Sequence, residues 1–209
     1  APNAYGFSID PNSPPGNLVM AYCDLSKIYL SRDSGATWKQ VVSEYVVQGN
    51  GTQSSTFRTA GVDNTVVQDM EIDYSSPNKL YTAFLDTAFW RSLDGGDSHE
   101  LLNKAPLETA WADAEASAID PAYPNIVYVS MGPTQKGQNL YRSVDHGGTF
   151  ELIGSPANGL GVTGRGYITD IVIDPVFHDG KRTLYVSVHR GYEDTADTDN
   201  LGYGVFKSI

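Results

Sequence analysis

The stretch Ser143-Val-Asp-His-Gly-Gly-Thr-Phe150 decides the fold class of this 209-residue chain. It alternates a hydroxyl residue, an aspartate, a glycine and a second hydroxyl residue, and it ends on an aromatic residue. The aspartate can accept hydrogen bonds from the backbone of its own turn, the glycine can adopt a positive φ, and the second hydroxyl ties the return strand. The pattern therefore predicts a tight turn between antiparallel strands, with the aromatic side chain packed in the core.

The same turn pattern occurs three times in the chain. The second copy runs from Ser31 to Trp38, and the third from Ser92 to His99, where a histidine stands in the aromatic position. The residues that we assign to turn formation are Ser31, Asp33, Gly35, Thr37, Trp38, Ser92, Asp94, Gly96, Ser98, Ser143, Asp145, Gly147, Thr149 and Phe150. The copies occur at the same position within a longer repeat, which indicates that the turn pattern has a structural rather than a chemical role.

The longer repeat is marked by an Ile-Asp pair that begins at Ile9, Ile72, Ile119 and Ile173. Each unit has an apolar run before the pair, a Pro/Asn/Gly turn, and further short apolar runs after it, which is typical of strands. Four antiparallel strands in a repeat of roughly 40 to 60 residues indicate a β-propeller blade.

We therefore expect an all-β chain of about three and a half blades, a segment of a larger, seven-bladed ring. The expected blades cover residues 4–48, 62–108, 112–158 and 164–209, and the last one stops before its turn motif. An open arc would leave strand edges unpaired. Self-association that closes the ring is the alternative to a longer chain.

The composition excludes several classes of function. With 14 Lys and Arg against 25 Asp and Glu, the formal net charge is −11, and such a surface repels nucleic-acid backbones. No apolar run is long enough to span a membrane. The single cysteine, Cys23, has no partner for an internal disulfide. A secreted, cell-surface or periplasmic location suits these features.

The three turns resemble the Asp-box, or BNR repeat, of sialidases, sortilin-like receptors and xyloglucanases. Over Phe7–Trp90 the chain is most similar to xyloglucanases, in Met20–Asp24 and in Gly61–Met70. This resemblance implies that Asp24 and Asp86, which follow the second strand of neighbouring units, are the acid and base of an inverting glycosidase. Such enzymes hold two carboxyl groups about 6.5–9.5 Å apart, one protonated and one ionised. The alternative reading is that both aspartates cap backbone N–H groups of tight loops.

Aromatic and basic residues near these positions are candidates for binding a sugar. Pyranose rings can stack on aromatic side chains, and the rim loops of the fourth unit add polar groups. The candidate substrate-binding residues are Tyr22, Phe89, Trp90, Trp111, His189 and Arg190. The aromatic members can equally belong to the core of a blade or to the interface between blades.

An acidic loop over residues 192–200 offers oxygen ligands for a structural Ca²⁺, and the candidates are Asp194, Asp197 and Asp199. A solvated acidic insertion is the alternative. No cofactor is expected to be required for activity. The expected partners are a polysaccharide or oligosaccharide, and the remaining blades of the same protein or a second propeller.

Two classes of function stay open. The first is an extracellular carbohydrate-active enzyme that hydrolyses a β-1,4-glucan such as xyloglucan. The second is a non-catalytic Asp-box propeller that serves as a glycan- or protein-binding scaffold or receptor module. The resemblance favours the first, and it leaves open whether the chain is an active enzyme.

Overall fold

A computed structural model describes residues 6–23, 28–41, 43–49, 55–59, 66–102, 106–107, 112–133, 138–160, 166–190 and 203–208. The regular structure over these ranges is β-strand, apart from one 3₁₀ turn at Pro156–Asn158. The chain divides into two compact units, Ala1–Thr65 and Val66–Ile209. The prediction of an all-β chain is confirmed.

The first unit holds one four-stranded antiparallel sheet, in chain order. Its strands are β1 (Gly6–Ile9), β2 (Met20–Cys23), β3 (Ile28–Ser31) and β4 (Lys39–Gln40). An antiparallel hairpin of β5 (Ser43–Val47) and β6 (Thr56–Thr59) follows the sheet. The repeat pattern did not predict this hairpin: β5 falls at the end of the expected blade over residues 4–48, and β6 lies between the first two expected blades.

The second unit contains three antiparallel sheets whose strands also follow chain order. The sheet nearest the start comprises β7 (Val67–Ile72), β8 (Leu80–Phe84), β9 (Ala88–Ser92) and β10 (His99–Leu101). The next comprises β11 (Ala112–Ile119), β12 (Val127–Pro133), β13 (Asn139–Ser143) and β14 (Glu151–Gly154). The last comprises β15 (Gly166–His178), β16 (Lys181–Arg190) and β17 (Gly204–Lys207).

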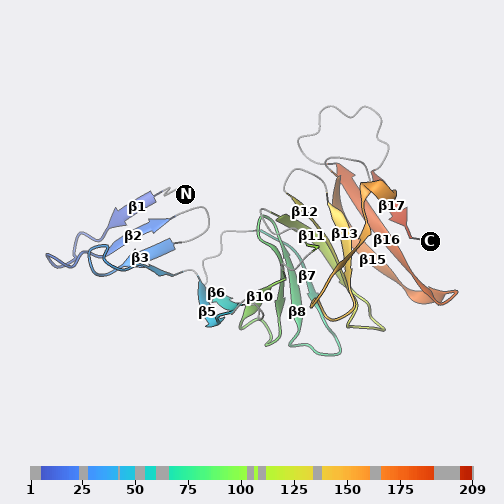
Figure 1. Ribbon diagram of the computed structural model, residues 1–209, viewed down its shortest axis with the longest axis horizontal. Helices are drawn as coiled ribbons and strands as arrows, with labels where there is room; N and C mark the ends of the chain where they lie inside the picture. Colours follow the sequence, from blue (N-terminus) through green and yellow to red (C-terminus); the bar gives the residue numbers. More distant parts are fainter. Residues whose placement is uncertain are drawn as a thin grey trace. The chain divides into compact units, whose positions relative to one another are not determined.

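These three sheets stand side by side, and the first strand of the middle sheet, β11, packs against the first strands of both neighbours, β7 and β15 (Figure 1). Up-and-down antiparallel sheets that meet through their first strands have the arrangement of propeller blades. The predicted blade architecture is therefore confirmed in its sheet topology.

The core of the second unit lies between the sheets. One cluster joins the first two sheets, where Phe89 stacks on Tyr81 at 5.8 Å between ring centroids and meets the edge of Phe150 at 6.3 Å. A second cluster joins the last two sheets around Ile168 and Val186. Small residues fill the first strand between them, since Ala114 and Ala116 are both buried. This packing sets the sheets face to face.

The turn that follows β13 is held by side chains of its own sequence pattern. The Asp145 carboxylate accepts hydrogen bonds from the backbone N–H and the hydroxyl of Thr149, both at 2.8 Å. The Ser143 hydroxyl donates to Asp145 and accepts from the N–H of Gly147. At Gly147, φ is +86°, and a Cβ atom there would lie 2.9 Å from the Leu102 side chain. Only glycine fits this position.

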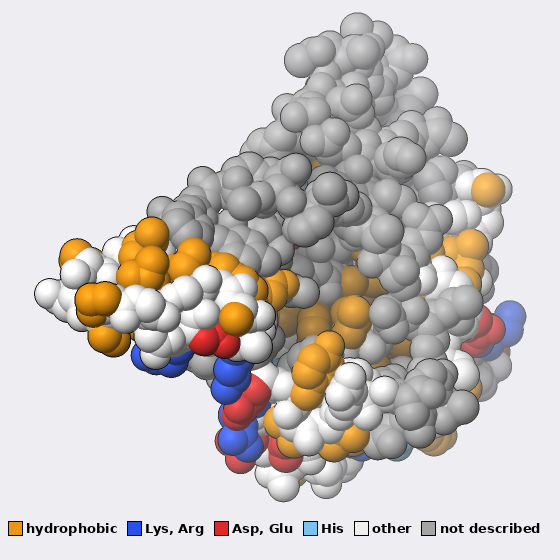
Figure 2. All heavy atoms as spheres, turned by 60° about the vertical axis from the view of Figure 1, so that its left-hand side comes forward, with side chains coloured by type: hydrophobic (Ala, Val, Ile, Leu, Met, Phe, Trp, Pro, Cys, Tyr) orange, Lys and Arg blue, Asp and Glu red, His pale blue; other side chains and the backbone are white. Residues whose placement is uncertain are grey.

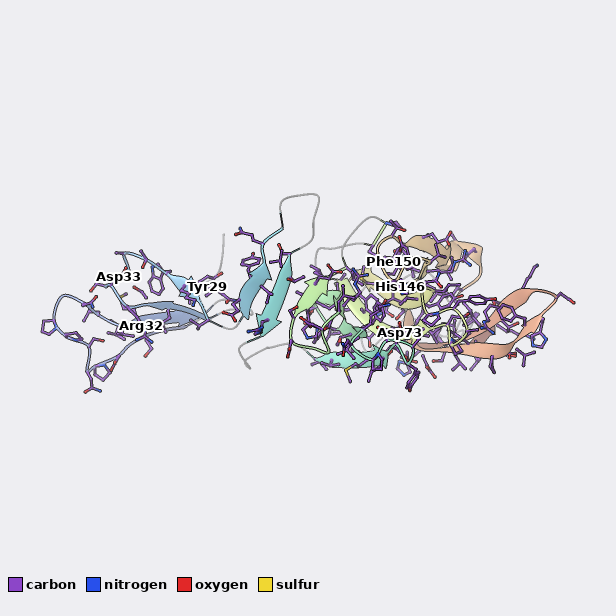
Figure 3. The ribbon with its side chains drawn as sticks, turned by 90° about the horizontal axis from the view of Figure 1, so that it is seen from below. Tyr29, Arg32, Asp33, Asp73, His146 and Phe150 are labelled. Carbon is purple, nitrogen blue, oxygen red and sulfur yellow. The ribbon has the colours of Figure 1, made fainter. Side chains whose placement is uncertain are left out.

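The two other copies of the turn have the same hydrogen bonds, around Asp33 and Asp94. Figure 3 labels Asp33 at its place in the first sheet. Bonds from Ser98 lower the pKa of Asp94 to about 2, because they stabilise the ionised carboxylate. We call these three segments the aspartate turns.

The aromatic residue of the aspartate turn does not reach the core in both copies that have one. Phe150 is buried as expected, with 8% of its surface exposed. Trp38 is 38% exposed, so its predicted core position is wrong. Its indole N–H instead donates to the carbonyl of Gly35, at 3.1 Å, and this bond holds the ring over its own turn.

The aspartates of the Ile-Asp pairs organise the turns after the first strands, and two of them sit next to cations. Asp73 accepts from Ser75 and from the Lys79 ammonium, which also lies 3.1 Å from Nδ1 of His146 in the next sheet (Figure 3). Asp120 binds both Nε and Nη2 of Arg182 at 2.6 Å, and both side chains are buried. Each pair of neighbouring sheets in the second unit is thus linked by a polar contact as well as by the core.

Replacing Asp145 by alanine is expected to lower the free energy of unfolding by about 1–2 kcal/mol, because two donors of Thr149 lose their acceptor. Urea unfolding followed by far-UV circular dichroism measures this loss. Asp145→Asn is the matched control, since its amide oxygen can still accept from the Thr149 N–H and should preserve much of the stability. Equal losses in the two variants would contradict the role of the hydrogen bonds.

Candidate functional site

The first strands of all three sheets in the second unit contain a β-bulge. The register shifts between Val67 and Asp69 in β7, between Ala114 and Ser117 in β11, and between Ile168 and Asp170 in β15. A bulge leaves one residue out of the ladder and redirects the side chains around it. The bulges lie at matching distances before the Ile-Asp pairs, so they are a shared feature of the three sheets.

Side chains satisfy the backbone groups at these bulges. In β11, the N–H of Ala116 donates to the Ser130 hydroxyl at 2.9 Å, and the N–H of Ser117 donates to the Asp69 carboxylate of the neighbouring sheet at 2.7 Å. In β15, the N–H of Ile168 donates to the side-chain carbonyl of Gln138 at 2.9 Å. Polar side chains on and beside the first strands are therefore needed inside the packed unit.

Asp86 lies in the tight turn between β8 and β9, where it has a φ of +66°. This left-handed conformation is uncommon for a residue with a side chain, although aspartate tolerates it better than most. The backbone N–H of Asp86 donates to Oδ1 of Asp113 at 2.9 Å, and Asp113 is 1% exposed on β11. The turn of one sheet is thereby attached to the first strand of the next, while the Asp86 residue itself stays exposed.

Glu115, two residues after Asp113 on the same strand, has an altered acidity. Burial, followed by the negative charge of Asp113, raises the pKa of Glu115 to about 7. Among the residues that the structure describes, none donates a hydrogen bond to its carboxylate. At neutral pH this carboxyl group exists in both protonation states and can give up or take a proton. We call Asp86, Asp113 and Glu115 the Asp86 site.

A second glutamate, Glu71 on β7, is similarly affected. Burial and the charges of Asp69 and Asp170 raise the pKa of Glu71 to about 7. Asp69 is already bound to Ser117, and Asp170 lies on β15. Carboxylates from two first strands, β7 and β15, therefore act on Glu71, which is itself half-buried.

The site residues that we predicted from sequence lie in different surroundings. Asp86 lies in the turn after β8, the second strand of its sheet, as the sequence predicted, and its catalytic role stays a prediction. Phe89 is fully buried in the core against Tyr81 and Phe150, so its predicted role as a sugar-stacking surface is wrong. Trp90 is half-buried, and its indole N–H donates to the carbonyl of Thr87 in the Asp86 turn at 2.7 Å. His189 is exposed on β16.

Several predicted residues lie outside the described part of the chain. They are Asp24, Trp111, Asp194, Asp197 and Asp199, together with the side chains of Tyr22 and Arg190. The proposed pairing of Asp24 with Asp86 and the calcium loop both stay predictions.

The sequence reasoning missed Asp113, Glu115 and Glu71. All three lie in the runs before the Ile-Asp pairs, which were interpreted only as short apolar strands. The signal was present in β11, where Asp113, Glu115 and Ser117 alternate with alanines. Alternation of this kind predicts a strand with one polar face, and carboxylates on such a face in a buried strand are candidates for chemistry.

Other kinds of site find no support within the described ranges. No group of three or more His, Cys, Asp or Glu residues there is arranged to hold a metal ion. On the face drawn in Figure 2, the coloured Lys and Arg side chains lie in small groups beside Asp and Glu, and they do not form a continuous basic patch there. The same part of the chain includes no helix with the length and apolarity required to cross a membrane.

Comparisons with known proteins give matches among solved structures only; no protein-family model and no curated protein matches the chain. An ancestral GH74 enzyme is 18% identical, with a TM-score of 0.45, over 91% of this chain and 23% of its own. The GH74 xyloglucanase from Xanthomonas campestris is 17% identical, with a TM-score of 0.44, over 98% of this chain and 30% of its own.

YCF48 from Cyanidioschyzon merolae is 14% identical, with a TM-score of 0.36, over 87% of this chain and 67% of its own. The chain thus spans 23% and 30% of the length of the two GH74 proteins. Because these TM-scores are low, the blade architecture stands on the strand pairing and side-chain contacts of the chain itself.

Glu71→Gln is expected to raise the melting temperature by roughly a few degrees at pH 8 and to leave it unchanged at pH 4. The folded chain keeps a proton on Glu71 up to about pH 7, whereas an unfolded glutamate loses its proton near its ordinary value of 4.5. The contribution of this carboxyl group to stability is therefore complete below about pH 4.5 and is lost as the pH rises through 7. Glutamine carries no charge at any pH and avoids the loss.

Thermal unfolding followed by circular dichroism at pH 4, 6 and 8 checks this expectation. Glu151→Gln is the control, since Glu151 is exposed and its replacement should give no such difference between pH 6 and pH 8. A Glu71→Gln effect of the same size at all three values would show that the proton on Glu71 is not its cause.

Proposed function

We propose that the second unit carries a glycoside hydrolase site of the inverting kind, in which Glu115 is the general acid and Asp86 the general base. The observation that carries this proposal is the attachment of the Asp86 turn to β11, the strand that bears Glu115, and the pKa of Glu115 is raised to about 7 by burial and by the charge of Asp113. Asp113 in turn binds the backbone of the turn that bears Asp86. Glu115 and the exposed Asp86, whose turn is attached to the strand of Glu115 through Asp113, would supply the two carboxyl groups that glycoside hydrolysis requires.

The reaction that this arrangement would perform is a single displacement. Glu115 donates its proton to the oxygen of the glycosidic bond as that bond breaks. The Asp86 carboxylate accepts a proton from a water molecule whose oxygen bonds to the anomeric carbon from the opposite face. The products are two shorter sugars with an inverted anomeric centre, a protonated Asp86 and an ionised Glu115. Proton exchange with solvent restores both groups.

A neutral polysaccharide is the substrate class that fits best. The net charge of −11 disfavours anionic polymers, whereas a β-1,4-glucan such as xyloglucan carries no charge to be repelled. The hydrogen bonds of the aspartate turns support the resemblance to Asp-box propellers, from which the expectation of a xyloglucanase-like substrate comes. An extracellular location is expected for an enzyme that acts on such a polymer.

Glu115→Gln and Asp86→Asn are each expected to lower kcat on xyloglucan by at least roughly 100-fold, because each removes one of the two proton transfers. Reducing-sugar release by the full chain at pH 6 measures the effect. Glu71→Gln is the matched control, since it removes a glutamate of similarly raised pKa that is not in the Asp86 site. Its activity should stay within about twofold of the wild type.

Two outcomes would contradict the hydrolase proposal. The first is a Glu71→Gln variant that loses as much activity as Glu115→Gln. The second is a wild-type chain that releases no reducing sugar from any β-1,4-glucan. In that second case, calorimetric binding of xyloglucan oligosaccharides would instead identify a non-catalytic, glycan-binding propeller.

A further inference from the structure

Asp113 has no part in the two proton transfers, and yet it binds the turn that bears Asp86 and its charge acts on Glu115. Its side chain is 1% exposed, and its Oδ1 accepts the backbone N–H of Asp86 from the neighbouring sheet. It is also the charge that acts on Glu115, two residues along β11. A buried carboxylate is costly to maintain, so a well-packed chain keeps one only where its charge or its hydrogen bonds are needed.

The hydrogen bond between Asp113 and the Asp86 N–H holds a turn whose backbone conformation is strained. Asp86 and Ala88 both have positive φ angles, of +66° and +67°. The N–H of Leu85 is bound to the carbonyl of Val66, so the contact with Asp113 is the next anchor along the turn. A strained turn of this kind keeps its conformation only where its surroundings hold it. The position of the Asp86 carboxylate therefore depends on an oxygen atom of Asp113.

The charge of Asp113 has an effect that is distinct from the hydrogen bond that its oxygen atom accepts. The other carboxylates on the first strands packed against β11 are Asp69 and Glu71 on β7 and Asp170 on β15. Asp86 lies in the turn between β8 and β9. Burial is the larger cause of the raised pKa of Glu115, and the charge of Asp113 is the second. The geometry thus gives one residue two effects that a suitable substitution can separate.

We propose that Asp113 is a positioning residue: its oxygen atom fixes the Asp86 turn, and its charge acts on Glu115, two residues along the same strand. This inference rests on the proposed function for its catalytic meaning. Both effects are nevertheless properties of the free chain, and they can be measured without substrate.

The test compares Asp113→Asn with Asp113→Ala in the full chain. Asparagine keeps a side-chain oxygen that can accept the Asp86 N–H, but it carries no charge; alanine removes both. NMR of the Glu115 side-chain carboxyl carbon follows its titration, and amide hydrogen exchange follows the protection of the Asp86 N–H. The basic limb of the kcat profile against pH is recorded in parallel.

In Asp113→Asn, the midpoint of the Glu115 titration should move to lower pH by at least about half a unit, because a neighbouring negative charge is gone. The basic limb of the kcat profile should move in the same direction, and Asp86 amide protection should stay within about threefold. In Asp113→Ala, the Glu115 titration should shift likewise, while amide protection at Asp86 falls roughly tenfold and kcat falls at all pH values.

Two results would overturn the inference: a Glu115 titration that is unchanged in Asp113→Asn, or Asp86 protection that falls equally in the two variants. If Asp113→Ala does not fold, the Glu115 titration and the Asp86 amide protection in Asp113→Asn still test the inference. Failure of the hydrolase proposal is recognised separately. It would appear as the expected NMR and exchange shifts in a chain that has no glucanase activity.

Discussion

The arrangement of the second unit depends on how the bulged first strands are satisfied. A bulge releases backbone groups that the ladder no longer pairs, and the packed sheets leave little room for water to replace them. Asp69 takes the N–H of Ser117, and Gln138 takes the N–H of Ile168, each across the boundary between two sheets. Neighbouring blades are therefore joined by hydrogen bonds that hold only one alignment, whereas apolar packing alone would tolerate sliding.

The same requirement explains why acidic groups lie on the first strands of neighbouring sheets. A carboxylate is a strong acceptor for an N–H that the ladder leaves unpaired: Asp69 accepts from Ser117 at the bulge of β11, and Asp113 accepts from Asp86 in the turn between β8 and β9. Each such charge then acts on the next carboxyl group along or across the strands. Glu71 and Glu115 are half-buried beside these aspartates, and their pKa values rise to about 7 as a result. Groups that titrate near neutral pH thus arise from the way the sheets are joined.

Much of the fold could be predicted from local sequence, because an aspartate turn satisfies its hydrogen bonds within eight residues. The bonds of Asp145 and the positive φ of Gly147 follow from the order of residue types. Trp38 could not be predicted, since its side chain has the choice between the core and its own turn. The Asp86 site was recognised only in part. Asp86 follows a strand and could be found by resemblance, but its partner Asp113 comes from another sheet, and nothing local connects the two.

The register of β11 is what brings the parts of that site together. Asp113 pairs with Gly132 and Ala114 with Met131, and the bulge follows immediately. A slip by one residue would place an alanine where Asp113 meets the Asp86 turn, and it would turn the carboxylates to the opposite face. The bulge opposes such a slip, because the N–H groups of Ala116 and Ser117 find acceptors only in the observed alignment. The bonds that stabilise the sheet boundary therefore also fix which side chain of β11 meets the Asp86 turn.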